Sequence, residues 1–221
     1  MPTPHSPSLV VSPTPEAAGF WIPHLTAWTG LVDRAHTVPG DWLVVLGASG
    51  GSGIAAVQLG KALGARVIAV VGDDERAEFC RGLGADATIN YRSGPIGPAL
   101  TEATDGHGPD LIYDPVGGTI AEESAAVMAR HGRLLAVGFA SGRWPKIATH
   151  DLVVKNTSLL GVLASGYTRA QLEDIHSKLE ALVVDGALRN AVTGEVRFAD
   201  LPAGLQQMAE HGVIGKRVVV P

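Results

Sequence analysis

A glycine-rich segment carries the clearest chemistry in the sequence. The segment follows an apolar run and contains Gly47, Ala48, Ser49, Gly50, Gly51, Ser52 and Gly53 in succession. Ala48, Gly50 and Gly53 fill the three places of a Gly/Ala-x-Gly-x-x-Gly pattern, in which small residues allow a tight turn and let backbone N–H groups approach a pyrophosphate. A helix that starts at such a turn adds its own N-terminal donors. The segment therefore predicts a phosphate-binding loop, and we expect no side chain to be tolerated at Gly50 or Gly53.

The glycine-rich segment has two alternative interpretations. A glycine-rich turn from a strand into a helix can be purely structural, and the pattern alone does not separate the two roles. A nucleoside-triphosphate loop would end in Gly-Lys-Ser or Gly-Lys-Thr, whereas this sequence has Gly-Ser-Gly at the same place. We therefore expect a dinucleotide as the ligand.

The choice of dinucleotide depends on residues about 20 positions further on, where an acid that binds the adenosine ribose normally ends the second strand. Val71 stands at this position. Arg76 and Tyr91 can instead hold a 2′-phosphate through charge and hydroxyl, so we expect NADP(H), with NAD(H) less favoured. In the opposing interpretation Arg76 is a solvated helix residue, Tyr91 packs under the adenine, and the carboxylates of Asp73 and Asp74 repel a phosphate.

A parallel sheet is needed to bring these residues together. Apolar runs begin at Trp42, Arg66, Ala87, Asp110, Arg133 and Ser158. Between them lie helical segments, at 51–63, 74–83, 95–103 and 119–130. This alternation is typical of βα repeats, and near-continuous runs of valine, leucine and isoleucine indicate strands covered on both faces. The sequence therefore predicts an α/β fold with a parallel sheet.

The two ends of the chain depart from this repeat. Residues 1–16 are rich in proline, serine and threonine, and we expect them to be flexible. Residues 17–38 are largely apolar and predict a helix, and residues 169–185 predict an amphipathic helix. Residues 192–198 alternate between apolar and polar like a strand with one covered face, and residues 216–220 form a short terminal strand.

Composition excludes several classes of function. The 221 residues are 46% hydrophobic with 28 glycines, which favours a folded chain over a disordered one. A net charge of −5 without runs of one sign predicts no binding to nucleic acid or to an anionic membrane. The long uncharged window at 42–60 contains several glycines and is interpreted as strand, loop and helix, not as a membrane span. A single cysteine and the lack of a cationic, apolar leader predict a cytoplasmic protein.

Catalytic side chains are not identified by the sequence. The eight histidines include no pair at metal-ligand spacing, and the lone Cys80 cannot supply a four-thiolate zinc site, so we expect no metal. The serines of the glycine-rich loops lack a nucleophile elbow, which disfavours hydrolysis. No tyrosine has a lysine four residues later, as short-chain dehydrogenases require.

Taken together, these motifs resemble the medium-chain dehydrogenase/reductase superfamily, in particular its zinc-free, zeta-crystallin-like quinone oxidoreductase branch. The resemblance spans residues 17–221. It rests on segments 47–53, 55–58, 63–66, 82–86, 89–91, 114–118, 132–134, 137–138 and 215–216. It implies a Rossmann fold, a doubly wound parallel sheet in the order 3-2-1-4-5-6, with remnant segments of a second domain. It also implies that Arg76 and Tyr91 take the usual 2′-phosphate positions of this branch.

The resemblance extends the list of expected cofactor-binding residues. It places segments 114–117 and 138–141, which follow the fourth and fifth strands, along the nicotinamide. The expected residues outside the phosphate loop are Gly72, Arg76, Tyr91, Asp114, Val116, Gly138, Phe139 and Ser141.

The chain also departs from its apparent family. Family members begin with a GroES-like catalytic domain, and we expect this chain to lack it. Residues 17–38 are then a helical remnant of that domain, 39–185 the Rossmann domain, and 186–221 segments that would join the catalytic domain. The last two strands would have unpaired backbone edges, which favour a homo-oligomer that covers them. Pairing between two copies of a sixth strand, near residues 158–163, is a second possible dimer surface.

Two functions therefore remain open. In the first, the protein is an NADPH-dependent oxidoreductase that transfers hydride, without zinc, to a quinone or a similar conjugated carbonyl. In the second, it is a truncated dinucleotide-binding module or subunit without turnover of its own. The sequence does not identify the small-molecule electron acceptor.

Overall fold

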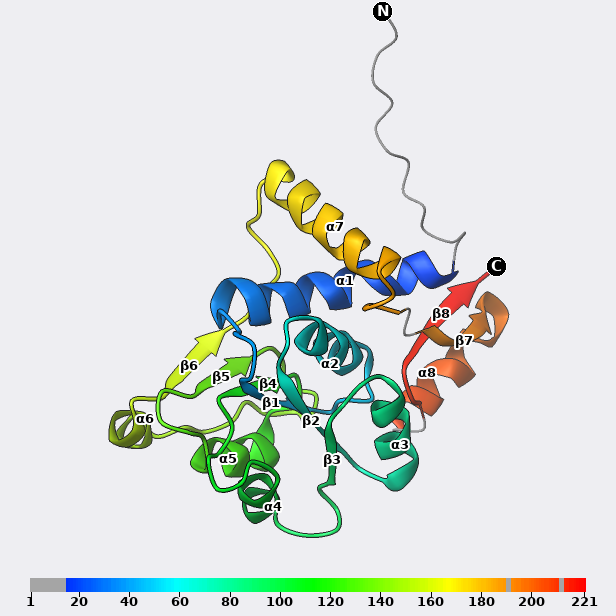
Figure 1. Ribbon diagram of the computed structural model, residues 1–221. Coiled ribbons are helices and arrows are strands. Elements are labelled where there is room, and N and C mark those ends of the chain that lie inside the picture. Colours follow the sequence, from blue (N-terminus) through cyan, green and yellow to red (C-terminus); the bar gives the residue numbers. More distant parts are fainter. Residues whose placement is uncertain (1–14, 190–191, 211–212) are drawn as a thin grey trace, which may run out of the picture.

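The computed structural model describes residues 15–189, 192–210 and 213–221, and its centre is a six-stranded parallel sheet (Figure 1). The strands are β1 (Trp42–Leu46), β2 (Arg66–Val71), β3 (Ala87–Asn90), β4 (Leu111–Asp114), β5 (Arg133–Ala136) and β6 (Ser158–Gly161). Their order is β3-β2-β1-β4-β5-β6, which confirms the predicted Rossmann topology. In this order β1 and β4 are neighbours at the point where the winding reverses, and ligands of such sheets bind at the carboxyl ends of the strands there.

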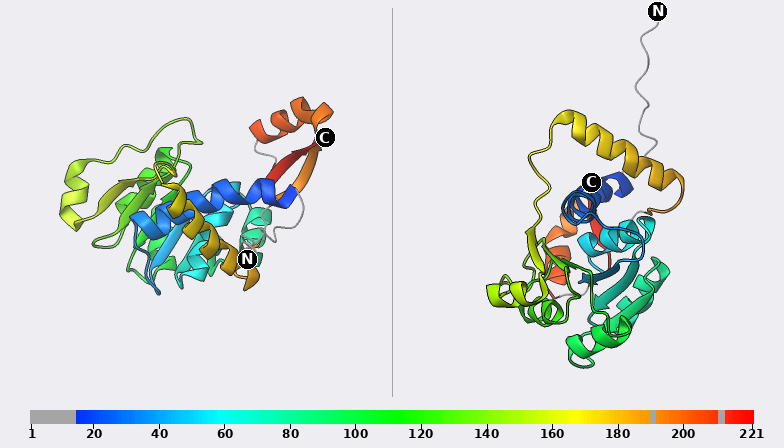
Figure 2. Two further views of the ribbon diagram at one scale, coloured as in Figure 1. Left: turned by 90° about the horizontal axis from the view of Figure 1, so that it is seen from above. Right: turned by 60° about the vertical axis from the view of Figure 1, so that its left-hand side comes forward.

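Helices cover both faces of the sheet. One face carries α1 (Pro15–Trp28), α2 (Gly51–Ala62) and α3 (Asp74–Gly82), and the other carries α4 (Ile96–Ala103) and α5 (Gly118–Ala126) (Figures 1 and 2). α7 (Arg169–Val184) lies on α1, on the side away from the sheet. Successive strand residues point to opposite faces. Leu43 and Val45 accordingly pack into the first layer, and Val44 and Leu46 into the second. This double burial explains the near-continuous apolar runs of the sequence.

The carboxyl-terminal residues form a small βαβ unit. It contains β7 (Val192–Arg197), a 3₁₀ turn (Phe198–Asp200), α8 (Leu201–Ala209) and β8 (Lys216–Val220). β7 and β8 pair in parallel, and the unit lies beside the amino-terminal part of α1 (Figures 1 and 2). The expected apolar face is partly covered, since Val218 is buried, whereas Phe198 has left the strand and is 72% exposed.

Several predicted boundaries were wrong by a few residues. Most of the predicted flexible segment 1–16 lies outside the described residues, but Pro15 already belongs to α1. A π-helical turn, Thr29–Arg34, continues that helix. α5 ends at Ala126, before the predicted 130, because the amide of Ala129 donates to the carbonyl oxygen of Pro109 instead of continuing the helix. The short exposed helix α6 (Thr149–Lys155) was not predicted.

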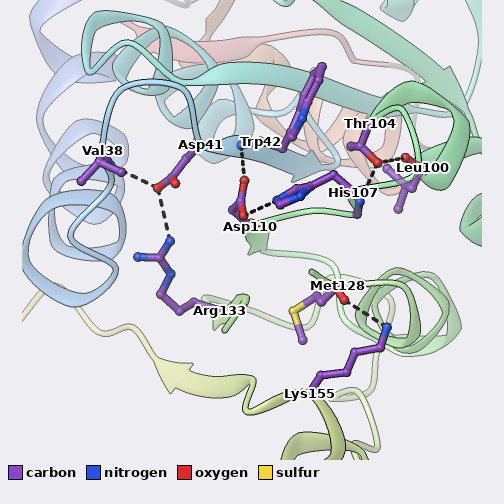
Figure 3. Close-up of polar contacts among 11 residues, drawn as sticks. Val38, Asp41, Trp42, Leu100, Thr104, His107, Asp110, Met128, Arg133 and Lys155 are labelled. Atoms are coloured by element: carbon purple, nitrogen blue, oxygen red, sulfur yellow. Dashed lines mark hydrogen bonds and ion pairs between the residues drawn. The ribbon is translucent and has the colours of Figure 1, made fainter. Parts of the chain in front are cut away.

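Two carboxylates join the loops at the amino ends of the strands (Figure 3). Asp110 accepts a hydrogen bond of 2.8 Å from the amide of Trp42 and contacts His107. Asp41 accepts hydrogen bonds from the amide of Val38 at 3.1 Å and from Arg133 at 3.2 Å. These bonds fix the amino-terminal ends of β1, β4 and β5. The carboxyl-terminal ends of the strands, on the opposite side, remain available to a ligand.

Candidate functional site

The phosphate loop connects β1 with α2 at the carboxyl edge of the sheet. Gly47 leaves the strand with a φ of +60°, a conformation that other residues rarely adopt. The amide of Gly50 donates to the carbonyl oxygen of Gly47 at 3.0 Å and closes the turn. α2 then begins without a capping side chain. The N–H groups of its first turn have no acceptor within the helix and are therefore available to an anion.

The two predicted key glycines differ in their surroundings. A Cβ on Gly53 would lie 2.4 Å from the carbonyl oxygen of Gly47 and 2.7 Å from the Cα of Ala48, so only glycine allows α2 to approach the loop this closely. A Cβ on Gly50 would meet only the Gly47 carbonyl oxygen, at 3.4 Å. The protein itself therefore has room for a methyl group at position 50. The expectation that no side chain is tolerated at Gly50 depends on the bound ligand alone.

The serines of the loop are turned toward the protein. The hydroxyl of Ser52 lies 2.9 Å from that of Tyr113 on β4. Ser49 is buried, and its carbonyl oxygen accepts a hydrogen bond of 2.8 Å from the amide of Gly215. The contribution of this loop to a phosphate site therefore comes from its backbone.

The residues expected near a 2′-phosphate lie together at the end of β2. A Cβ on Gly72 would lie 3.0 Å from the hydroxyl oxygen of Tyr91, so the tyrosine is folded over the glycine. Asp73 caps α3 by accepting a hydrogen bond of 2.9 Å from the amide of Arg76, and its carboxylate also pairs with the Arg76 guanidinium. These contacts, with a smaller contribution from the charge of Arg92, hold the pKa of Asp73 below its usual value. The Asp73 carboxylate thus orients the Arg76 guanidinium at the end of β2. A bound 2′-phosphate would have to compete with this carboxylate for the guanidinium.

The loops after β4 and β5 form one hydrogen-bonded layer. Oδ1 of Asp114 accepts hydrogen bonds from the amides of Val116 at 2.9 Å and Gly117 at 2.6 Å. The Asp114 carbonyl oxygen accepts from the amide of Gly138 at 3.1 Å. The amide of Ser141 donates to the Val116 carbonyl oxygen at 2.8 Å. Burial raises the pKa of Asp114, and the hydrogen bonds from the amides of Gly117 and Val116 oppose that shift.

The layer also touches the phosphate loop. A Cβ on Gly47 would lie 2.8 Å from Cγ2 of Val116, so the first loop residue and the β4 loop are in direct contact. The structure therefore brings the phosphate loop and the predicted nicotinamide loops to one edge of the sheet.

A cavity of about 760 Å³ opens beside this layer. It is lined by Ala136, Val137, Gly138, Phe139, Ala140, Trp144, Gly161, Val162 and Leu163, none of which carries a charge. The rings of Phe139 and Trp144 lie 4.8 Å apart between centroids. Phe139 was predicted from the sequence, whereas Trp144 and Leu163 were not, since they lie outside the recognised motifs. The uncharged lining suits an apolar molecule next to the predicted nicotinamide position.

The described part of the chain contains neither a cluster of metal ligands nor a membrane-spanning helix. Within residues 15–189, 192–210 and 213–221, no three histidine, cysteine or carboxylate side chains gather as metal ligands would. Over the same residues, no helix is both long and apolar enough to span a bilayer.

Comparison with known proteins places the chain in a family. Residues 51–181 match the family model described as zinc-binding dehydrogenase. The chain is 36% identical, over 155 residues, to a quinone oxidoreductase-like protein 2 homolog of Nematostella vectensis, covering 70% of this chain and 42% of that protein. It is 30% identical, over 209 residues, to a 2-haloacrylate reductase of Burkholderia, covering 92% of this chain and 62% of that protein. The chain thus spans about half the length of these relatives.

Solved structures agree in fold. A mycobacterial protein complexed with NADPH matches with a TM-score of 0.89 and 28% identity, over 98% of this chain and 68% of that one. Escherichia coli quinone oxidoreductase complexed with NADPH matches with a TM-score of 0.84 and 26% identity, over 93% and 65%. The chain belongs to the medium-chain dehydrogenase/reductase family, among the relatives of the quinone oxidoreductases.

Proposed function

We propose that the protein binds NADP(H) and transfers hydride between the nicotinamide and a quinone or similar conjugated carbonyl. The observation that carries this proposal is the geometry of the loop at residues 47–53, which we call the phosphate cradle. Only glycine at position 53 lets α2 begin in contact with Gly47, and the first turn of α2 has no capping side chain. Such a helix terminus attracts a pyrophosphate. The NADPH bound by two of the structural relatives supports the same ligand here.

Each part of the cofactor has a counterpart in the site. Backbone amides of the loop and of α2 would hold the pyrophosphate, and Arg76 with Tyr91 would hold the 2′-phosphate. Val116, Gly138 and the following loop would orient the nicotinamide, which supplies the hydride. The apolar cavity next to Phe139 would exclude water and receive the acceptor.

Zinc independence and a reducing, cytoplasmic location are part of the proposal. The sequence holds one cysteine, Cys80, which is buried. Burial raises the pKa of its thiol to about 12, so it is neither a thiolate ligand nor a reactive nucleophile near neutral pH.

The division of the chain stays a proposal as well. We assign dinucleotide binding to residues 39–185, and we assign residues 17–38 and 186–221 to the part that would contact a catalytic domain. β6 forms one edge of the sheet, where Leu159 is 43% and Leu163 78% exposed. Pairing of two copies along this edge would cover both. Light scattering should therefore report a dimer or larger assembly, and a stable monomer at all concentrations would contradict this.

Turnover distinguishes the proposed enzyme from a binding module. NADPH consumption is measured with a panel of quinones and conjugated ketones, and Gly53→Val serves as a control that lacks the cradle. Consumption that depends on both the acceptor and Gly53 supports the oxidoreductase. Tight NADPH binding without consumption of any acceptor supports the alternative, a dinucleotide-binding module or subunit.

A further inference from the structure

The loop between β5 and α6 brings two aromatic rings to the apolar cavity. Phe139 and Trp144 both lie in this loop, and each is 50% exposed. Their ring centroids lie 4.8 Å apart, with the ring planes tilted by 43°. Large apolar side chains that gather on a surface mark places where a ligand or partner binds. We call these two rings the aromatic wall of the cavity.

One carboxylate of α5 holds the loop on both sides of Trp144. Oε1 of Glu122 accepts a hydrogen bond of 2.7 Å from the guanidinium of Arg143 and another of 2.7 Å from the amide of Lys146. The carbonyl oxygen of Arg143 also accepts a hydrogen bond of 3.0 Å from the amide of Gly118. Because Trp144 lies between these anchored residues, its backbone is held in place before any ligand binds. Less conformational entropy is then lost on binding.

The aromatic wall has the chemistry to recognise a flat, unsaturated ring. Aromatic rings attract one another most strongly in offset-stacked or edge-to-face arrangements. Since the two rings are tilted, a planar molecule that stacks on the indole of Trp144 contacts Phe139 at an angle. The cavity of about 760 Å³ has room for a fused two-ring molecule, and no charged side chain lines it. A small aliphatic enone fits the same space but offers no ring face to the indole.

We propose that Trp144 determines which acceptor the protein prefers, because its indole stacks on planar aromatic quinones and favours them over small aliphatic enones. Phe139 completes the aromatic wall, and Glu122 is a positioning residue that keeps Trp144 at the cavity. The electron-rich indole and the electron-poor ring of a quinone form a favourable stacked pair. This inference rests on the proposed function, because it names the substrate class of the same site.

The test measures how tightly the full chain binds two acceptors in the presence of NADP⁺, which has no hydride to donate, so that no turnover occurs. The probes are menadione, a fused two-ring quinone, and cyclohexenone, a small aliphatic enone. Trp144→Leu removes the ring but keeps an apolar side chain, and Trp144→Phe keeps a ring. Phe198→Leu removes an exposed ring of the carboxyl-terminal unit as a matched control.

The expected result is selective for the aromatic probe. Trp144→Leu should weaken menadione about tenfold and cyclohexenone less than about twofold, because only menadione stacks on the indole. Trp144→Phe should recover most of the affinity for menadione. Phe198→Leu should bind both probes like the unmodified chain.

A double-mutant comparison tests the role of Glu122. Glu122→Gln removes the charge that holds Arg143 and should weaken menadione about threefold. The same substitution in the Trp144→Leu chain should cause no further loss, because the carboxylate acts through Trp144. Equal losses in both backgrounds would overturn the positioning role.

Titration of every variant with NADP⁺, together with thermal unfolding, separates this proposal from the proposed function. Unchanged menadione affinity in a folded Trp144→Leu variant would overturn the role of Trp144 while leaving the cofactor and the hydride transfer intact. Equal weakening of both probes would also overturn it, because stacking acts only on the aromatic one. If Trp144→Leu fails to fold, Trp144→Met provides the same comparison. Failure of the unmodified chain to bind NADP⁺ would instead contradict the proposed function.

Discussion

The hydroxyl oxygens of Ser52 and Tyr113 lie 2.9 Å apart, which joins the first turn of α2 to the middle of the sheet. Burial raises the pKa of Tyr113 to about 12, so the phenol stays protonated at any ordinary pH. Both hydroxyls are thus neutral and bind each other, and the Ser52 side chain is directed toward the protein. The Ser52 side chain therefore has a structural role, whereas its backbone amide is one of the donors that face the proposed phosphate site.

Replacing Ser52 by alanine should therefore lower stability without lowering cofactor affinity. We expect a loss of about 1 kcal/mol in the free energy of unfolding, because the Tyr113 hydroxyl loses its partner. Denaturant unfolding measures the stability, and fluorescence titration measures NADPH affinity. A loss of affinity tenfold or greater with unchanged stability would show that the hydroxyl contacts the ligand instead.

The two glycines of the loop should respond differently to a side chain. Gly53→Val should abolish cofactor binding and destabilise the protein, since even a Cβ there meets the Gly47 carbonyl oxygen at 2.4 Å. Gly50→Ala should fold with a stability within about 1 kcal/mol of the unmodified chain, because its Cβ meets that oxygen only at 3.4 Å. Unfolding curves and fluorescence titrations of both variants test this. Normal NADPH binding by Gly53→Val would reduce the loop to a purely structural role.

Asp73 and Arg76 should have opposite effects on cofactor choice. Arg76→Ala should weaken NADPH by about 1 to 3 kcal/mol and leave NADH nearly unchanged, because only NADPH carries the 2′-phosphate. Asp73→Ser keeps a side chain that can cap α3 but removes the carboxylate that pairs with Arg76. It should therefore strengthen NADPH relative to NADH. Parallel titrations of both cofactors decide the matter, and equal losses for the two in Arg76→Ala would place the arginine away from the 2′-phosphate.

Acid should destabilise the protein through His24 of α1. This side chain is buried, its Nδ1 lies 2.7 Å from the Phe20 carbonyl oxygen, and burial lowers its pKa from 6.5. The unfolded chain therefore binds a proton near pH 6.5 that the folded chain does not, and the free energy of unfolding falls as the pH drops through that value. His24→Gln removes this titration. Its unfolding free energy should depend less on pH between 7.5 and 5.5 than that of the unmodified chain, and identical pH profiles would contradict the assignment.

The sequence predicted the sheet and the loop well because both follow from local rules. Strands buried on both faces must be apolar throughout, as Leu43 to Leu46 are. The first turn of α2 contacts the loop so closely that position 53 must be glycine. The pairing of Gly50 with Gly215 was not predicted, because no local pattern reports a contact between segments so far apart. The orientation of the Ser52 hydroxyl was not predicted for the same reason, since its partner Tyr113 lies on β4, far from Ser52 in the sequence.

The helices missed by the sequence were those with weak local signals. α6 has no buried residue, and its apolar residues, Leu152 to Val154, are consecutive and not spaced along one helical face. In α8 the only buried residue is Gly204, which packs closely on Val196 of β7. A glycine at the packed face gives no apolar periodicity to recognise. Small or exposed helices of this kind depend on tertiary contacts that a sequence pattern does not contain.

The central claim is that this chain binds NADPH through the loop at residues 47–53, and calorimetric titration tests it most directly. The unmodified chain is titrated with NADPH and with NADH, and Gly53→Val is titrated with NADPH. We expect saturable binding of one cofactor per chain, tighter for NADPH than for NADH, and no binding by the variant. Absence of binding by the unmodified chain, or equal binding by Gly53→Val, would contradict the claim.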